Sequence, residues 1–155
     1  MNKSRVYILM LAIVTLLTCS TTFAQKSKTE KTEQGIHFIE NDWALALKNA
    51  KAQNKLVFLD IYATWCGPCK MLKQYTFSDK AVGDFFDKNF ISISVDGEKG
   101  VGPDLAKQYQ IEGYPTMVVA DATGKPVLIT AGYIDSKVLM QFVNEALKRN
   151  AKASN

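Results

Sequence analysis

The chain has 155 residues, of which 47% are hydrophobic and 22% are charged, and its formal net charge is +4. This length and composition predict one globular domain, and so weak and dispersed a positive charge argues against nucleic acid as a partner. With three cysteines and one histidine, the chain offers a poor ligand set for a structural zinc site, which needs four well-spaced ligands.

Residues 1–24 predict a secretory signal peptide. Two basic residues near the start precede an almost unbroken apolar run, 7–17, and small residues then place the cleavage site after Ala24. The apolar run is shorter than the roughly 20 residues that span a membrane. We therefore expect an exported, periplasmic protein, and lipidation at Cys19 or an uncleaved anchor are the alternatives.

Residues 25–35 are polar and lysine-rich and predict a flexible lead before a domain at 36–149. Within the domain, apolar runs alternate with stretches of apolar 3–4 spacing. In chain order they predict a strand at 36–39, a helix after Asn41 or Asp42, a strand at 56–62, a helix to about Thr76, a helix after Ser78 or Asp79, a strand at 90–95, a helix opened by Pro103, strands at 117–120 and 126–130, and a helix over 137–149 capped by Ser136. A frayed tail is expected at 150–155.

This order of elements predicts an α/β fold. Strands that alternate with helices imply parallel neighbours, and the late hairpin adds antiparallel strands. We expect a central mixed sheet of about five strands, flanked by helices on both faces.

Cys66 and Cys69 lie where the apolar strand gives way to a helix. Free N–H groups and the positive end of the dipole at a helix N-terminus favour a thiolate over a thiol. A strand, a Cys-X-X-Cys pair and a helix in this order predict a redox site. A static disulfide is the alternative, although so short a loop removes little entropy from the unfolded chain. After cleavage at Ala24 these two are the only cysteines left, so no third thiol can exchange with them.

Asp60 lies inside the apolar strand that precedes the two cysteines. A carboxyl group in this position is expected to be buried and tuned by burial. Cys66, at the helix start, is expected to be the more exposed cysteine and the attacking thiolate, whereas Cys69 lies deeper and resolves the mixed disulfide. Asp60 is placed to accept the proton that Cys69 must lose.

Taken together, these residues resemble the thioredoxin family over 36–149. The run Trp65–Lys70 matches the family's active-site motif residue for residue, and Asp60 matches its buried aspartate. Tyr114-Pro115-Thr116 matches the cis-proline turn opposite the cysteines, and Gly132 matches a glycine on the substrate-binding rim.

The resemblance implies a thioredoxin fold and a thiol–disulfide oxidoreductase that reduces disulfides in proteins through a reversible Cys66–Cys69 disulfide. It implies no cofactor and no metal, and it implies a monomer. The substrate-binding residues implied are Trp65, Gly67, Pro68, Tyr114, Pro115 and Gly132. Tyr62 is a further candidate for an apolar rim, and His37 is expected to be an ordinary strand residue.

The stretch 75–79 is more similar to exported thioredoxin-like domains of transmembrane thiol-reducing systems. That likeness implies a membrane thiol-reductant transporter as the electron donor. Two other functions stay open: a disulfide oxidase or isomerase on the same fold, and a Cu(I) carrier that uses the cysteine pair.

One position departs from the family pattern. Thioredoxins carry a lysine on the third strand near the buried aspartate, and an ungapped count from Asp96 puts Ser92 there. Without that cation, Asp60 loses a partner that would hold it ionised, and we expect burial to raise its pKa further.

Overall fold

The structure is a computed structural model, and it describes residues 34–153. The predicted signal peptide, its cleavage site at Ala24 and the alternative lipidation site Cys19 lie outside the described residues. Within the described range, no helix combines the length and the apolar composition needed to cross a membrane.

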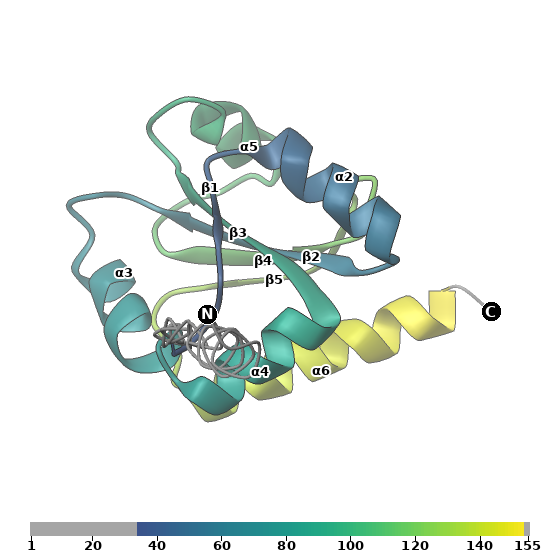
Figure 1. Ribbon diagram of the computed structural model, residues 1–155. Helices are drawn as coiled ribbons and strands as arrows, with labels where there is room; N and C mark the ends of the chain where they lie inside the picture. Colours follow the sequence, from purple (N-terminus) through teal and green to yellow (C-terminus); the bar gives the residue numbers. More distant parts are fainter. Residues whose placement is uncertain (1–33, 154–155) are drawn as a thin grey trace, which may run out of the picture. The chain divides into compact units, whose positions relative to one another are not determined.

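Across residues 34–153, five strands form one mixed sheet in the order β1–β3–β2–β4–β5 (Figure 1). The strands are β1 (Ile39–Glu40), β2 (Leu56–Tyr62), β3 (Phe90–Asp96), β4 (Thr116–Ala120) and β5 (Pro126–Ala131). β1 and β2 pair in parallel with β3, whereas β4 is antiparallel to β2 and β5 is antiparallel to β4. This arrangement confirms the predicted α/β class and mixed sheet, with β5 and its proline at an edge where a missing N–H is tolerated.

Helices cover both faces of the sheet. They are α2 (Trp43–Gln53), α3 (Gly67–Met71), the π-helical turn η1 (Leu72–Thr76), α4 (Lys80–Asn89), α5 (Gly102–Gln108) and α6 (Ser136–Ala153). In Figure 1, α2 and α5 lie on one side of the sheet, and α3, α4 and α6 lie on the other. Side chains alternate along a strand, so Leu59 and Ile61 pack toward α2 and α5, whereas Phe58 packs toward α4 and α6. Asp60 follows Phe58 in this alternation and therefore faces the layer of α3 and η1.

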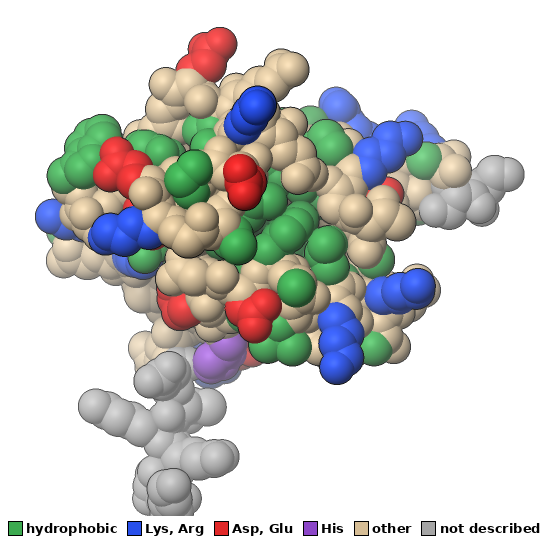
Figure 2. Space-filling view, turned by 90° about the horizontal axis from the view of Figure 1, so that it is seen from above, with side chains coloured by type: hydrophobic (Ala, Val, Ile, Leu, Met, Phe, Trp, Pro, Cys, Tyr) green, Lys and Arg blue, Asp and Glu red, His purple; other side chains and the backbone are tan. Residues whose placement is uncertain are grey.

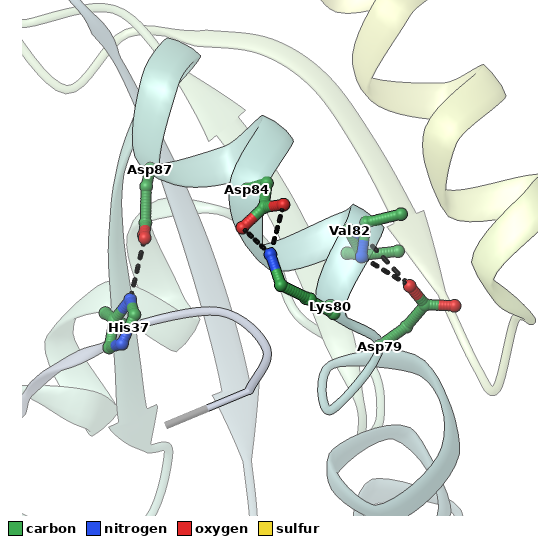
Figure 3. Close-up of polar contacts among 7 residues, drawn as sticks. His37, Asp79, Lys80, Val82, Asp84 and Asp87 are labelled. Atoms are coloured by element: carbon green, nitrogen blue, oxygen red, sulfur yellow. Dashed lines mark hydrogen bonds and ion pairs between the residues drawn. The ribbon is translucent and has the colours of Figure 1, made fainter. Parts of the chain in front are cut away.

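Polar contacts fix the start of α4 (Figure 3). The Asp79 carboxylate accepts hydrogen bonds from the backbone N–H groups of Ala81 and Val82, which confirms one of the two predicted caps. Lys80, the first residue of the helix, forms an ion pair at 2.7 Å with Asp84, one turn further along. These contacts fix the start of α4 at Lys80, directly after its cap Asp79.

The segment before β1 is joined to α4 by a side-chain contact. His37 Nδ1 lies 2.7 Å from Asp87 Oδ2 (Figure 3). The predicted strand at 36–39 is wrong in its bounds, because only Ile39 and Glu40 pair with β3. His37 accordingly precedes the strand instead of lying in it.

The C-terminal helix differs from its prediction at both ends. Asp135, not Ser136, caps α6, because its Oδ1 accepts a backbone N–H at 2.8 Å. The helix then runs through Ala153, past the predicted end at Arg149. The residues after Arg149 include alanine and lysine but no glycine or proline, so nothing stops the helix there. The predicted frayed tail at 150–155 is therefore helical as far as Ala153.

A tight backbone crossing includes Gly35, the last residue of the predicted lead at 25–35, which is buried in the domain, whereas residues 25–33 lie outside the described range. The next residue, Ile36, donates its N–H to the Phe77 carbonyl at 2.8 Å. Gly35 has a φ of +103°, which favours glycine, and its backbone crosses Gly83 of α4. A Cβ added to Gly83 would overlap the main chain of Gly35.

We expect Gly83→Ala to lower the free energy of unfolding by about 2 kcal/mol, because over-packing of this crossing outweighs the gain in helix propensity. Urea unfolding measures the change. Gly113→Ala is the matched control, since a Cβ there would meet nothing within 4 Å. Equal losses in the two variants would show that the crossing is not tight.

Candidate active site

Cys66 and Cys69 are joined by a disulfide at the start of α3. Cys66 is the N-cap residue, and the backbone N–H of Cys69 donates a hydrogen bond to Cys66 Sγ over 3.1 Å. Gly67 and Pro68 form the first two positions of the helix, where proline loses no hydrogen bond. In the reduced protein, the same N–H and the helix dipole would favour Cys66 as a thiolate.

The two cysteines do not differ in exposure, contrary to the prediction. Cys66 is 3% exposed and Cys69 is 4% exposed. Both pack with Ala63 and with the rings of Tyr62 and Tyr114, which cover the disulfide. What distinguishes the two sulfur atoms is their place on the helix, because Cys66 caps it and Cys69 lies inside its first turn.

Trp65 forms the exposed side of the site. Its side chain is 67% exposed, and its indole N–H points between the two carboxylate oxygens of Glu98, at 3.0 and 3.1 Å. The ring also packs edge-on against Tyr114, with centroids 6.0 Å apart. Figure 2 shows a group of hydrophobic side chains at the left of the face, with acidic side chains beside it, and further hydrophobic side chains across the middle.

The turn that carries Glu98 is held in place by Asp96, at the end of β3. Asp96 accepts the N–H of Glu98 at 3.1 Å and pairs with Lys99 at 2.9 Å. Between them, Gly97 donates its N–H to the Tyr62 carbonyl at 2.7 Å. Sequence reasoning missed Glu98, since a carboxylate in a loop gives no sign of which ring it will meet.

The predicted proline turn lies beside the disulfide. The peptide bond between Tyr114 and Pro115 is cis. Gly132, which has a φ of +88°, donates its N–H to the Pro115 carbonyl at 2.8 Å. Tyr114 joins this turn to the cysteines, so the predicted site residues from three separate stretches of chain meet at one end of the sheet.

Asp60 is 2% exposed on β2. Burial is the main cause that raises its pKa to about 7, and a hydrogen bond from Ser94 opposes the rise. Ser94 Oγ lies 3.1 Å from Asp60 Oδ2, while Oδ1 has no hydrogen-bond partner among residues 34–153. A buried carboxyl group with a free oxygen and a pKa near neutrality is suited to proton exchange.

The residue in register with Asp60 on β3 is Ser94, whereas Ser92, which the ungapped count matches to the family's lysine, lies two residues earlier on the same face. In the parallel register Asp60 pairs with Ser94, and Ser92 pairs with Phe58. Ser94 carries no charge, so β3 provides no lysine beside Asp60, as the sequence predicts. Sequence reasoning missed that Lys73 of η1 acts on Asp60 instead, although a spacing of four from Cys69 puts the two on one helix face.

The comparisons with known proteins agree with this geometry. A family model of the thioredoxin-like domain matches residues 43–147. The thiol:disulfide interchange protein DsbD of Pseudoalteromonas atlantica is 33% identical over 115 residues, which are 69% of this chain and 19% of that protein. The DsbD relatives of Actinobacillus pleuropneumoniae and Vibrio cholerae are matched over 17% and 14% of their lengths, so the chain spans less than a fifth of each of these three proteins.

Solved structures share the fold. The solution structure of a protein from Bacteroides thetaiotaomicron, described as a disulphide-isomerase, superposes with a TM-score of 0.67 and 38% identity, over 74% of this chain and 94% of that one. The oxidised C-terminal domain of Neisseria meningitidis DsbD superposes with a TM-score of 0.57 and 26% identity, over 66% of this chain and 90% of that domain. The chain therefore has the predicted fold, with a disulfide-bonded Cys66–Cys69 pair at its helix start.

Proposed function

Because the chain belongs to the thioredoxin-like domain family, we propose that it is a thiol–disulfide oxidoreductase that reduces disulfides in exported proteins. The observation that carries this proposal is the Cys66–Cys69 disulfide at the N-cap of a helix, together with the buried Asp60, which has a free carboxyl oxygen among the described residues. A static disulfide would need neither the cap nor a titrating group beneath it.

The reaction we propose has two exchange steps. The Cys66 thiolate attacks one sulfur of a client disulfide, forming a mixed disulfide and releasing the other client sulfur as a thiolate. Asp60 then accepts the Cys69 proton, and the Cys69 thiolate attacks Cys66 Sγ. The Cys66–Cys69 disulfide forms, the second client thiol leaves, and two electrons have passed from the protein to the client.

The rim around the disulfide supports an extended protein segment as the client. Trp65 offers an exposed aromatic surface that packs against Tyr114, and the Tyr114–Pro115 turn, bonded to Gly132, packs against the cysteines. Backbone groups of such a turn can pair with a client strand, and the aromatic rings can bind its apolar side chains. Gly67 adds no side chain at the helix start, which allows a client backbone to come close.

We place the protein outside the cytoplasm, on the strength of the signal-peptide pattern at 1–24. The likeness to DsbD proteins supports a membrane thiol-reductant transporter as the donor that returns two electrons to Cys66–Cys69. We expect a monomer without cofactor or metal to suffice for exchange with clients.

The reduction potential tests the direction of the reaction. At equilibrium with glutathione, we expect the Cys66–Cys69 couple to have a potential near about −270 mV, the value of thioredoxin. A potential above about −180 mV would overturn the reductase proposal and favour an oxidase or isomerase. Tight Cu(I) binding without any disulfide reduction would instead favour a soft-metal carrier.

The isomerase alternative is kept because of the 38% identity to the Bacteroides thetaiotaomicron protein. An isomerase must leave the client before Cys69 resolves the mixed disulfide, so it would reactivate a protein with scrambled disulfides faster than it reduces one. We expect the opposite order of rates here, because the Asp60 beneath the site favours rapid resolution.

A further inference from the structure

A row of side chains crosses the sheet beneath the active-site helix. Glu40, Ser94, Asp60 and Met117 are in register on β1, β3, β2 and β4. Neighbouring strands lie about 4.8 Å apart, and β3 lies between β1 and β2, so the backbones of Glu40 and Asp60 are separated by two strand spacings, about 10 Å. Asp60 is buried and Glu40 is exposed, and the hydroxyl of Ser94 lies between them.

Lys73 reaches this row from the π-helical turn η1. Its Nζ lies 4.0 Å from the centre of the Tyr62 ring. Tyr62 follows Asp60 by two residues on β2, so both side chains lie on the same face of the sheet. Tyr62 also packs against the cysteines. The Lys73 ammonium group therefore lies over the ring of Tyr62, which shares a face of the sheet with Asp60 and packs against the cysteines.

The charges around Asp60 act in opposite directions. Burial is the largest influence and raises the pKa of Asp60, the positive charge of Lys73 lowers it, and the negative charge of Glu40 raises it. Tyr62 is the other titratable side chain on this face of β2, and Cys69 lies on α3, in the helix layer that Asp60 faces. Ser94, the partner on β3, supplies a neutral hydroxyl, so the attraction that favours the carboxylate comes from the helix side of the site.

We propose that Lys73 is a positioning residue for proton transfer, whose ammonium group, held over the Tyr62 ring by η1, stabilises the Asp60 carboxylate so that it can take the proton of Cys69. This role rests on the proposed function, because it serves the resolving step of disulfide exchange. Lys73 touches neither sulfur nor client and acts through Asp60 alone.

The test is the titration of Asp60 in the oxidised protein, followed by the NMR signal of its carboxyl carbon. In Lys73→Gln, we expect the midpoint to move to higher pH by about half a pH unit, because a nearby cation is lost. Lys73→Arg should restore the wild-type midpoint, since arginine keeps the charge and stacks on aromatic rings. Glu40→Gln should move the midpoint to lower pH.

Lys48→Gln is the matched control, because it removes an exposed lysine charge from α2 on the opposite face of the sheet. An unchanged midpoint in Lys73→Gln, or an equal shift in Lys48→Gln, would overturn the proposal. The midpoint is measured without any client, so it remains informative even if the reduction potential rejects the reductase function.

A kinetic readout completes the test. With a disulfide peptide, the release of the second thiol reports the resolving step, and its pH profile should shift in Lys73→Gln in the same direction as the Asp60 midpoint. Alkylation of Cys66 by iodoacetamide reports the attacking thiol alone and should shift less. A profile that stays in place while the midpoint moves would overturn the role in proton transfer.

Discussion

Cys66→Ser should slow the reduction of a disulfide peptide by at least about a thousandfold, whereas Cys69→Ser should keep the first attack and stop at the mixed disulfide. A serine hydroxyl is not ionised at neutral pH, so Cys66→Ser has no nucleophile at the helix cap. Cys69→Ser retains the cap and its N–H donor to Cys66 Sγ. Mass spectrometry of the protein after exposure to the peptide should find the adduct in the second variant alone.

The two variants are each other's control. Both replace one sulfur by oxygen at sites that are 3% and 4% exposed and three residues apart, so their structural cost is similar. A difference between them therefore reports the roles of the two cysteines and not damage to the fold. Adducts of equal amount at Cys66 and Cys69, each in the variant that retains it, would contradict the assigned roles.

The trapping variant also addresses the clients. Proteins that stay bound to Cys66 in Cys69→Ser are joined by a bond that a reductant releases, so they can be recovered and identified. We expect secreted proteins with disulfides to be enriched among them. A single predominant protein would indicate a dedicated reductase, and a broad set would indicate a general one.

The sequence was sufficient to predict a cysteine pair at the start of a helix because the residues that form this site are close together in the chain. The cysteine pair, the helix that follows it and the acidic residue in the preceding strand are adjacent in the chain, and periodicity places them correctly. The proline turn needed the resemblance to a family, since Tyr114 and Pro115 lie far along the chain from the cysteines. Its place beside the disulfide depends on the pairing of β2 with β4.

Contacts that depend on register could not be predicted. The ungapped count places Ser92 near Asp60, whereas the register of β3 pairs Ser94 with it, and both are buried serines on the same face. The equal burial of Cys66 and Cys69 also depends on rings from β2 and from the Tyr114 turn. Glu98 and Lys73 reach the site from a loop and from a π-helical turn, and local sequence patterns fix neither geometry.

Asp60→Asn should make the oxidised protein more stable above neutral pH and leave its stability nearly unchanged in acid. Burial raises the pKa of Asp60 from 3.8 in the unfolded chain to about 7 in the folded one. Below the pKa of the unfolded chain, Asp60 is protonated in both the folded and the unfolded state, so its ionisation does not change the free energy of unfolding. As the pH rises between these two values the unfolded state loses its proton first, so the wild-type protein loses stability until the pH passes about 7.

The size of the effect follows from the same two pKa values. A difference of about three pH units corresponds to about 4 kcal/mol, which asparagine avoids because it carries no charge. Asparagine can also keep an acceptor for the Ser94 hydroxyl, which donates to Asp60 over 3.1 Å. Urea unfolding at about pH 4 and about pH 8 measures the gain, which should appear at the higher pH alone. A gain of equal size at both pH values would mean that the ionisation of Asp60 is not its cause.

The same variant should be the slower catalyst, and this opposition is the sharpest test of the role of Asp60. Asparagine cannot accept the Cys69 proton, so release of the second client thiol should slow by about a hundredfold near neutral pH. Attack by Cys66, measured by alkylation, should change much less, because the Cys66 thiolate is stabilised by the backbone N–H of Cys69 at the helix start. A buried carboxyl group that destabilises the fold but speeds one step of the reaction is explained by function. If Asp60 served packing, its replacement by asparagine would lower the free energy of unfolding instead of raising it. A variant that is both more stable and equally fast would assign the proton of Cys69 to solvent.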